Sequence, residues 1–350
     1  MNVGLILGME HPAGDDPARR FAEHREQVRL ARAAGFDLVG IPHHYSRGPS
    51  QWFPPLVSAA ALAADAGQMR IATTVLLLPM LHPVETAEQA AMLDVLTGGR
   101  FVFGVGAGWQ PAEFHALGVP MEGRLARLEE ALTVIEPLWT GDPVTFHGRH
   151  FALEDVRLTL RPVQRPRPPI WMGANAAAAA VRRAARLADA WIVSAHPDLE
   201  TVERHLETYR EALDALGKPF PPELPVLRNA YVAADLETAL AEARPYFEAR
   251  GALRRRPSHG HAPAAWRRAP ARPADHRRPR GLPRPDRGVP GAGADRLPDP
   301  PHAVARHAAR ARRAGDRARR REAPAGAAAT VTSRPRRLTG RGRFYGRDTE

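Results

Sequence analysis

The chain has 350 residues and no Cys, with 50 Lys and Arg against 38 Asp and Glu. This length allows one large barrel domain or two ordinary domains. The sequence contains no uninterrupted run of about 18 apolar residues, which excludes a transmembrane helix, and its N-terminus lacks the basic head of a secretory signal. The lack of Cys excludes disulfides and thiolate metal sites, and we expect a cytoplasmic protein.

The net charge of +12 is unevenly distributed along the chain. Residues 251–350 contain 26 Arg, no Lys and 8 acidic residues, a balance of +18, which leaves residues 1–250 with a balance of −6. A mildly acidic first part has no electrostatic footprint for nucleic acid, and we expect no specific nucleic-acid partner for it.

Short apolar runs alternate with stretches of helical periodicity through residues 1–250. The apolar runs predict strands at residues 3–7, 36–41, 71–78, 101–105, 170–172, 191–193 and 226–232. The periodic stretches predict helices at residues 21–31, 56–66, 84–96, 125–138, 176–187, 199–216 and 236–249. Strict alternation of strand and helix is typical of a parallel sheet with right-handed crossovers.

Seven strand–helix units, with space for an eighth, favour a closed (β/α)8 barrel of the TIM type over an open doubly wound sheet. We therefore expect residues 1–250 to form a barrel that lacks its last unit. Residues 142–169 interrupt the alternation with a strand-like pattern and predict an inserted hairpin. This hairpin is either a cap over the carboxyl-terminal mouth of the barrel or a β-rich addition without a role.

Residues 251–350 differ in kind from the rest of the chain. They contain 4 Leu, 3 Val, 1 Phe, no Ile and no Met against 13 Pro, too few apolar side chains to offset chain entropy, and we expect a disordered segment. Three explanations are open: a basic nucleic-acid-binding tail, a disordered linker, or translation out of frame from a GC-rich gene. The last is favoured, because shifted GC-rich codons yield mostly Arg, Ala, Pro, Gly and His.

Several short segments follow one another in a characteristic order through the first 250 residues. They are residues 40–45 (GIPHHY), 93–101 (LDVLTGGRF), 104–109 (GVGAGW), 127–132 (RLEEAL), 138–141 (LWTG), 168–173 (PPIWMG) and 183–191 (RAARLADAW). None is specific alone. Together, the segments in 1–250 resemble those of the bacterial luciferase-like flavin-dependent monooxygenases, whereas residues 251–350 do not match.

The resemblance implies a flavin-dependent oxidoreductase, first of all a monooxygenase that uses reduced FMN and O2 on a small organic substrate. Coenzyme F420 with hydride transfer is the alternative, since the same barrel and glycine turn serve both cofactors. A separate flavin reductase and a homo-oligomer are also expected, and no membrane partner is. The competing class is an inactive, truncated barrel with a basic tail that adheres to nucleic acid.

Two strand ends are candidate cofactor-binding segments. At Gly106, Ala107 and Gly108 the missing side chains would let the planar flavin ring approach the backbone, although a tight turn is the alternative. Gly173, Ala174 and Asn175 open a helix whose free N–H groups could bind the flavin phosphate, although ordinary capping by Asn175 explains them too.

Two histidines lie just past the second expected strand, on the face where barrel active sites occur. His43 and His44 are candidate catalytic residues, because a neutral imidazole can donate to a flavin or relay a proton. The family pattern is often Glu-His-His, and Pro42 stands here in the Glu position. A surface histidine pair is the alternative, and Glu10, after the first strand, is a further candidate acid.

Three aromatic residues could surround an apolar substrate, or could equally belong to the core: Trp52, Trp109 and Phe114. The remaining histidines of this region include His11, His82, His115, His147 and His150. Their spacing is not that of metal ligands, and no metal site is expected.

Overall fold

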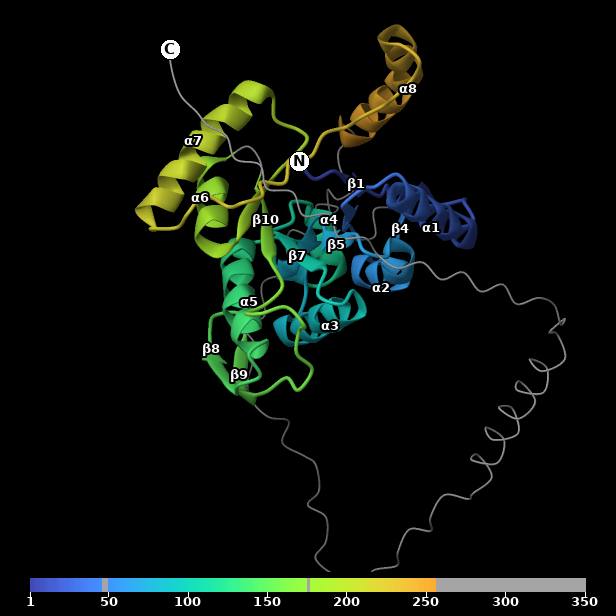
Figure 1. Cartoon of the computed structure of the whole chain (residues 1–350). Coiled ribbons are helices and arrows are strands. Elements are labelled where there is room, and N and C mark those ends of the chain that lie inside the picture. The colour runs from blue at the N-terminus through green and yellow to red at the C-terminus, as the bar shows by residue number, and fades with distance from the viewer. Residues whose placement is uncertain (46–49, 175–176, 256–350) are drawn as a thin grey trace, which may run out of the picture. The chain divides into compact units, whose positions relative to one another are not determined.

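The computed structural model describes residues 1–45, 50–174 and 177–255 (Figure 1). Six parallel strands form its main sheet in the order β1 (Gly4–Ile6), β3 (Leu38–Ile41), β5 (Arg70–Thr73), β7 (Phe101–Gly106), β10 (Ile170–Ala174) and β11 (Ala190–Val193). A short parallel strand, β6 (Leu76–Leu77), also pairs with β7. The first six expected strands are thus confirmed, and all run in parallel.

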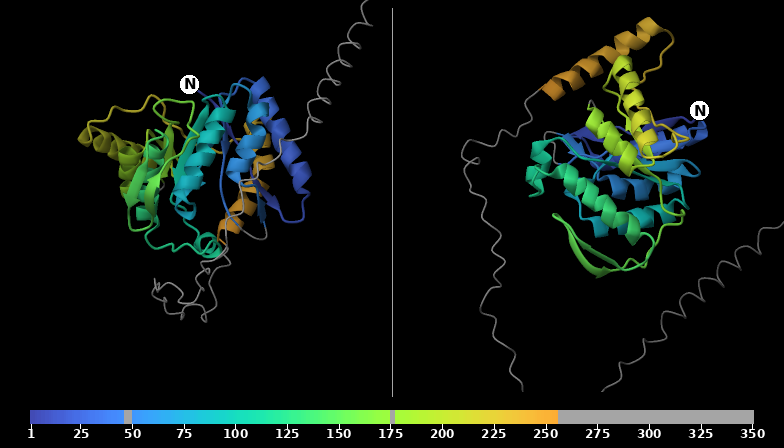
Figure 2. Two further views of the ribbon diagram at one scale, coloured as in Figure 1. Left: turned by 90° about the horizontal axis from the view of Figure 1, so that it is seen from below. Right: turned by 90° about the vertical axis from the view of Figure 1, so that its left-hand side faces the viewer.

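Seven of the eight described α-helices lie at the places that the periodicity predicts, and the short helix at residues 111–116 is additional. The eight described helices are α1 (Pro17–Ala33), α2 (Pro55–Ala66), α3 (Pro83–Leu96), α4 (Pro111–Ala116), α5 (Arg124–Leu138), α6 (Ala178–Leu187), α7 (Leu199–Ala215) and α8 (Leu236–Arg255). The first four begin at a proline, whose fixed φ and missing N–H suit the first helical turn. Neighbouring helices pack side by side around the sheet, as Figure 2 shows for α1 to α3. Within the described ranges, no helix is long and apolar enough to cross a membrane.

The two faces of the sheet are buried in different ways. On β7, Phe101, Phe103 and Val105 pack with the helices in the main core. Val102 faces the other side, in a smaller interior cluster with Leu38, Ala72, Trp171, Ala190 and Ile192. Because side chains alternate along a strand, Gly104 and Gly106 lie on this interior face.

The prediction of a seventh strand at residues 226–232 is wrong. Only one bridge forms, between Val193 and Val226, and Val226 and Val232 are 51% and 91% exposed. A strand is stable where it pairs with a neighbouring strand and is covered by another layer. On their outer side, Val226 and Val232 have neither a paired strand nor a covering layer among the described residues. The described strands therefore form a parallel half-barrel.

Glu223 connects the two ends of this half-barrel. Its carboxylate accepts hydrogen bonds from Asn2, just before β1, at 2.7 Å and from the Arg70 guanidinium at 2.6 and 2.9 Å. Glu223 itself precedes the bridge beside β11, the last strand. The sheet is therefore curved enough to bring its first and last segments together at the amino-terminal ends of the strands.

The expected strand at residues 71–78 is divided in two. Between β5 and β6, the Thr73 hydroxyl bonds to the backbone N–H and C=O of Gly104 at 2.9 and 2.7 Å, in place of ladder bonds. A Cβ atom at Gly104 would collide with the Thr73 carbonyl oxygen. This irregularity projects Val75 into the interior face of the half-barrel, where it packs on the interior cluster.

The inserted hairpin is confirmed as β8 (Val144–His147) paired antiparallel with β9 (Ala152–Val156). It packs along α5, where the Glu130 carboxylate accepts hydrogen bonds from the backbone N–H groups of Arg149 and His150 at 3.0 and 2.8 Å. A role for the hairpin as a cap over the strand ends stays a prediction. The hairpin extends the helical layer.

Candidate active site

Four of the residues expected at the mouth lie at or just past the carboxyl ends of parallel strands: His43, His44, Gly106 and Gly173. His43 follows β3, and its Nδ1 atom accepts a hydrogen bond from the backbone N–H of Leu77 in β6 at 3.1 Å. Leu77 is in turn the Cα partner of Gly106 at the end of β7. These contacts place His43, His44, Gly106 and β6 at one end of the half-barrel.

Val75 determines the shape of this end. A Cβ atom at Gly106 would lie 2.5 Å from Val75 Cγ2, and one at Gly173 would lie 3.2 Å from Val75 Cγ1. Val75 therefore lies across both glycines, so the interior surface here consists of backbone and one branched apolar side chain. Gly108 differs from them, because its φ of +70° belongs to a turn that favours glycine.

The other candidate cofactor residues have different surroundings. Ala107 is partly buried against the main core, and Ala174 is buried in it, with its carbonyl accepting the Trp191 indole N–H at 3.0 Å. Asn175 lies outside the described residues. The side chain of Ala174 therefore points away from the interior face that Gly106 and Gly173 share.

The two histidines have different environments. Burial and the adjacent His44 lower the pKa of His43 to about 3, and its ring lies 4.4 Å from that of Tyr45. The His44 side chain is 19% exposed and its Nδ1 atom lies 2.8 Å from Glu113 Oε1. A surface pair is thus excluded for His43, which is only 4% exposed.

Glu113 is a site residue that the sequence analysis missed. It comes from the short helix α4, is 1% exposed, and also accepts the backbone N–H of Tyr45 at 2.8 Å. Its second oxygen, Oε2, is buried with no hydrogen-bond partner in the described part of the chain. The sequence offered no sign of this contact beyond a Glu next to Phe114, because His44 and Glu113 are 69 positions apart in the chain.

The three aromatic candidates separate in the structure. Phe114 is buried in a small cluster with Leu77 and Met80, so it belongs to the core. Trp52 is partly buried, and its ring lies 4.6 Å from that of His44. Trp109, just past Gly108, is 58% exposed. Trp52 and Trp109 therefore remain candidates for substrate contact.

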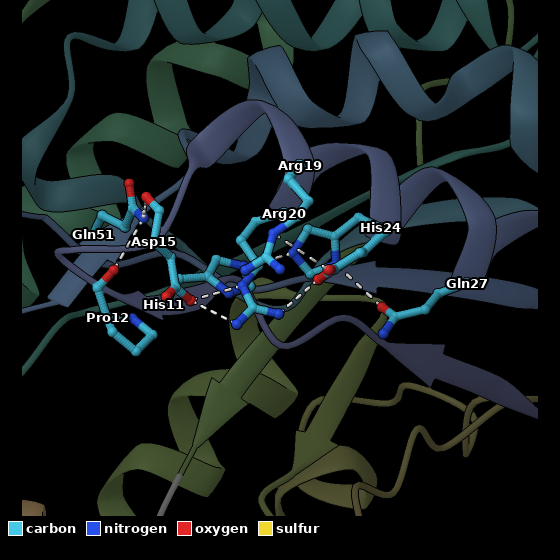
Figure 3. A network of polar contacts seen from close by, with 9 residues as sticks. His11, Pro12, Asp15, Arg19, Arg20, His24, Gln27 and Gln51 are labelled. Carbon is cyan, nitrogen blue, oxygen red and sulfur yellow. Dashed lines mark hydrogen bonds and ion pairs between the residues drawn. The ribbon is translucent and has the colours of Figure 1, made fainter.

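Glu10 is exposed in a two-stranded ribbon, β2 (Glu10–Pro12) with β4 (Ser50–Trp52), where it is the Cα partner of Trp52. The ribbon is attached to α1 by the network in Figure 3. There, the Nε2 atoms of His11 and His24 lie 2.8 Å apart, and Gln27 Oε1 lies 3.1 Å from His24 Nδ1. Glu10 therefore lies on an element that contacts His44 through Trp52.

Two arginines at the start of α5 were also missed. Arg124 Nε donates to the carbonyl of Gly108 at 3.3 Å, and Arg127 Nε donates to that of Pro79 at 2.7 Å. Both carbonyls belong to segments that follow β7 or β6 at the mouth. These guanidinium groups place positive charge beside the glycine turn, where an anionic group of a ligand would be stabilised.

The fold is an α/β fold with a parallel half-barrel, the class in which active sites lie at the carboxyl ends of the strands. A family model described as luciferase-like monooxygenase matches residues 1–296. The chain therefore belongs to the luciferase-like monooxygenase family. The match runs past residue 250, where we expected the resemblance to end.

The relatives of this chain include two proteins named as monooxygenases. The chain is 37% identical over 163 residues to 4-hydroxyprotoasukamycin monooxygenase of Streptomyces nodosus subsp. asukaensis, covering 46% of this chain and 44% of that protein. It is 26% identical over 245 residues to the oxygenase component of the flavin-dependent trigonelline monooxygenase of Acinetobacter baylyi, covering 68% and 67%. The chain spans about half the length of the first curated relatives that it matches.

Solved structures show the same fold. Monooxygenase RslO1 from Streptomyces bottropensis is 28% identical, with a TM-score of 0.66 over 72% of this chain and 78% of that one. The fold also occurs in an FMN complex of 3,6-diketocamphane monooxygenase from Pseudomonas putida, with 23% identity, a TM-score of 0.60 and coverages of 69% and 70%. An F420-dependent tetrahydromethanopterin reductase from Methanopyrus kandleri has this fold as well, with 22% identity, a TM-score of 0.56 and coverages of 68% of this chain and 69% of that one.

Proposed function

We propose that this protein is the oxygenase of a flavin-dependent monooxygenase that uses reduced FMN and O2 on a small organic substrate. The observation that carries the proposal is the mouth itself: Val75 lies across Gly106 and Gly173 and gives the interior face an apolar surface beside His43 and His44. Family membership over residues 1–296 supports the same reaction class.

The residues at the mouth fit a flat cofactor with an anionic arm. A flat ring would pack on Val75, which lies across Gly106 and Gly173 because neither carries a side chain. Arg124, which donates to the Gly108 carbonyl, and Arg127, which donates to the Pro79 carbonyl, would bind the phosphate. Ala107, Gly108 and Ala174 would contribute backbone groups only, and the proposed role of Asn175 is untested.

Reduced flavin, when bound, supplies the electrons that activate O2. The protein positions the substrate, excludes water and moves a proton, for which His44 is the proposed catalytic residue. Trp52 and Trp109 would contact the substrate, and Glu10 lies on the ribbon that carries Trp52. Because the relative from Acinetobacter is named as an oxygenase component, we also propose a separate flavin reductase as partner.

Coenzyme F420 with hydride transfer is the second candidate, since a protein that binds F420 shares this fold. The test is to titrate the purified full chain with reduced FMN and with F420, and to follow the fluorescence of each cofactor. Consumption of O2 in the presence of a flavin reductase and a panel of small substrates then separates the two reactions. Tight F420 binding without O2 consumption would replace the first proposal by the second.

A homo-oligomer is proposed from the surface of α2. Its four exposed positions are all apolar: Val57, Ala60, Ala61 and Ala64. Met92, Val95 and Leu96 are exposed at the end of the adjacent helix α3. A helix that is apolar on its solvent side as well as its core side is typically covered in the functional state, here by a second copy of this chain.

The origin of residues 251–350 stays a proposal as well. We propose that the reading frame changes near residue 250, so that the described half-barrel is followed by out-of-frame sequence; the expected disorder falls outside the described residues. The family match extends to residue 296, past the proposed position, and counts against a change at residue 250 itself. The nucleotide sequence around codon 250 decides the question.

A further inference from the structure

The adjacent histidines of the mouth are held in opposite tautomers. The Nδ1 atom of His43 accepts the backbone N–H of Leu77 at 3.1 Å, so the ring proton of a neutral His43 resides on Nε2. Because that side chain is 4% exposed, water does not compete for the contact. A proton on Nδ1 would face the Leu77 N–H and leave this buried amide without an acceptor.

His44 has the reverse arrangement. Its Nδ1 atom lies 2.8 Å from Glu113 Oε1, the same oxygen that accepts the Tyr45 N–H at 2.8 Å. A carboxylate oxygen that already accepts one hydrogen bond requires a donor at Nδ1, so a neutral His44 has its lone pair on Nε2. Its side chain is 19% exposed, which leaves the ring accessible to a bound molecule.

The carboxylate of Glu113 has no cationic partner other than His44 among the described residues. It is 1% exposed, and its Oε2 atom has no hydrogen-bond partner there. The titratable groups around it are His43, which is buried and neutral at pH 7, and Tyr45, whose pKa is raised by burial and by Glu85 and Glu113. A proton that arrives at His44 is therefore compensated by Glu113 through the existing hydrogen bond.

We propose that Glu113 is a positioning residue that fixes His44 as the proton acceptor of the site through Nε2, whereas His43 is restricted to donating a hydrogen bond. In the transfer, an O–H or N–H group bound at the mouth gives its proton to Nε2 and keeps the electron pair. The imidazolium so formed stays bonded to Glu113 through Nδ1–H. The identity of the proton donor rests on the proposed function, but the two tautomers do not.

The test uses the full chain labelled with 15N-histidine, without cofactor, and reads the tautomer of each ring from two-bond 1H–15N spectra. His43→Gln and His44→Gln identify the two sets of signals by their loss. We expect His43 to carry its proton on Nε2 and His44 on Nδ1 at pH 7.5. The same tautomer in both rings, or the reverse assignment, overturns the proposal.

Two substitutions at Glu113 separate positioning from general packing. Glu113→Ala removes the acceptor, and His44 is expected to shift towards the Nε2–H form. Glu113→Gln keeps an oxygen for both donors and is expected to retain the wild-type tautomer. If thermal unfolding shows that Glu113→Ala is folded and its His44 tautomer is unchanged, the proposed role of Glu113 is overturned. If Glu113→Ala does not fold, Glu113→Gln decides: loss of the Nδ1–H tautomer of His44 in that variant overturns the role.

Turnover provides the second readout. Glu113→Ala should lower kcat by about 10²-fold, the lower end for loss of a proton-transfer group, with little change in KM, and Glu113→Gln should restore most of it. Combining Glu113→Ala with His44→Ala should lower kcat little further than His44→Ala alone, and an additive loss overturns the coupling. Correct tautomers in a wild-type chain that consumes no O2 support this assignment and contradict the proposed function.

Discussion

At the scale of single residues, the mouth depends on side chains that are absent as much as on those present. Gly106 and Gly173 make room for Val75, and Gly104 makes room for the backbone of Thr73. His43 and His44 then occupy the loop beside this apolar surface, one buried and one accessible. Each position allows a substitution with a defined outcome.

The His44→Ala substitution should lower turnover by about 10²–10⁴-fold, the usual effect of removing a positioned proton-transfer group. Flavin affinity should change little, because the proposed phosphate ligands are Arg124 and Arg127 rather than His44. Steady-state kinetics and flavin fluorescence titration measure the two effects. Unchanged turnover, or a large loss of flavin binding, would contradict the assigned role.

The Gly104→Ala substitution should destabilise the fold, because its Cβ atom would collide with the Thr73 carbonyl, which is backbone and cannot move aside cheaply. The expected loss in the free energy of unfolding is about 1–3 kcal/mol, typical of overpacking. Gly14→Ala is the matched control, since a Cβ atom there meets nothing within 4 Å. Urea denaturation compares the two variants, and equal midpoints would show that the β5–β7 junction adapts.

At the scale of elements, the ribbon of β2 and β4 links the mouth to α1. Trp52 of the ribbon contacts His44, and His11 of the ribbon contacts His24 of α1. Phe53 packs against both histidines, with ring centroids 5.3 and 5.8 Å away. The position of Trp52 therefore depends on a pair of imidazoles that must share a single proton between their facing nitrogens.

This pair predicts a loss of stability on acidification. Burial lowers the pKa of His24, and burial, His24 and Arg20 lower that of His11, against smaller opposing effects of Asp15 and Glu23. Below about pH 6.5 the unfolded chain therefore binds more protons than the folded one. The stabilisation from the neutral pair is complete above that pH and is lost as the pH falls towards the folded pKa values.

The measurement is urea denaturation at pH 7.5, 6.5 and 5.5, with His24→Gln as the comparison. An amide oxygen at position 24 can still accept a hydrogen bond from His11 but does not titrate. We expect a shallower decline in the free energy of unfolding for this variant. Parallel declines for both chains would mean that other histidines carry the pH dependence.

At the scale of the whole molecule, two surfaces lack a covering layer among the described residues. One is the apolar solvent face of α2, and the other is the pair of sheet edges at β1 and β11, where β11 gains only the bridge at Val226. Unpaired strand edges present N–H and C=O groups that can pair with another chain. Both surfaces concern association, and they call for different experiments.

The proposed oligomer is tested by Ala61→Glu on α2. A charge at the centre of a covered apolar face should shift the chain from oligomer to monomer, because an unpaired buried charge is costly. Leu199→Glu on α7 is the control, since Leu199 is 66% exposed and lies on a different helix. Light scattering after size-exclusion chromatography gives the masses. A wild-type monomer, or an oligomer that survives Ala61→Glu, excludes this face.

Restoring the reading frame near residue 250 should improve folding. A closed barrel has no free edges, whereas the described half-barrel leaves β1 and β11 without outer partners. The corrected chain should be more soluble, unfold at a higher temperature and retain flavin better than the chain as it stands. If the present chain unfolds cooperatively and binds flavin equally well, the prediction that a frameshift impairs its folding is wrong.

The sequence by itself determined the local elements and the family. Apolar runs and helical periods predicted six strands, seven of the eight described α-helices and the inserted hairpin, because burial on one face imposes a pattern that neighbouring residues carry. The position of the histidines after β3 also followed, since parallel strands end on one face. These are short-range consequences of chain geometry.

Tertiary structure alone decided what depends on distant contacts. Residues 226–232 have the composition of a strand but make a single bridge, because a strand needs a partner to satisfy its backbone groups. Val75 was predicted within a continuous strand, yet the Thr73–Gly104 bonds displace it across Gly106 and Gly173. Glu113 reaches His44 across 69 positions, and its role arises from burial, which no local pattern encodes.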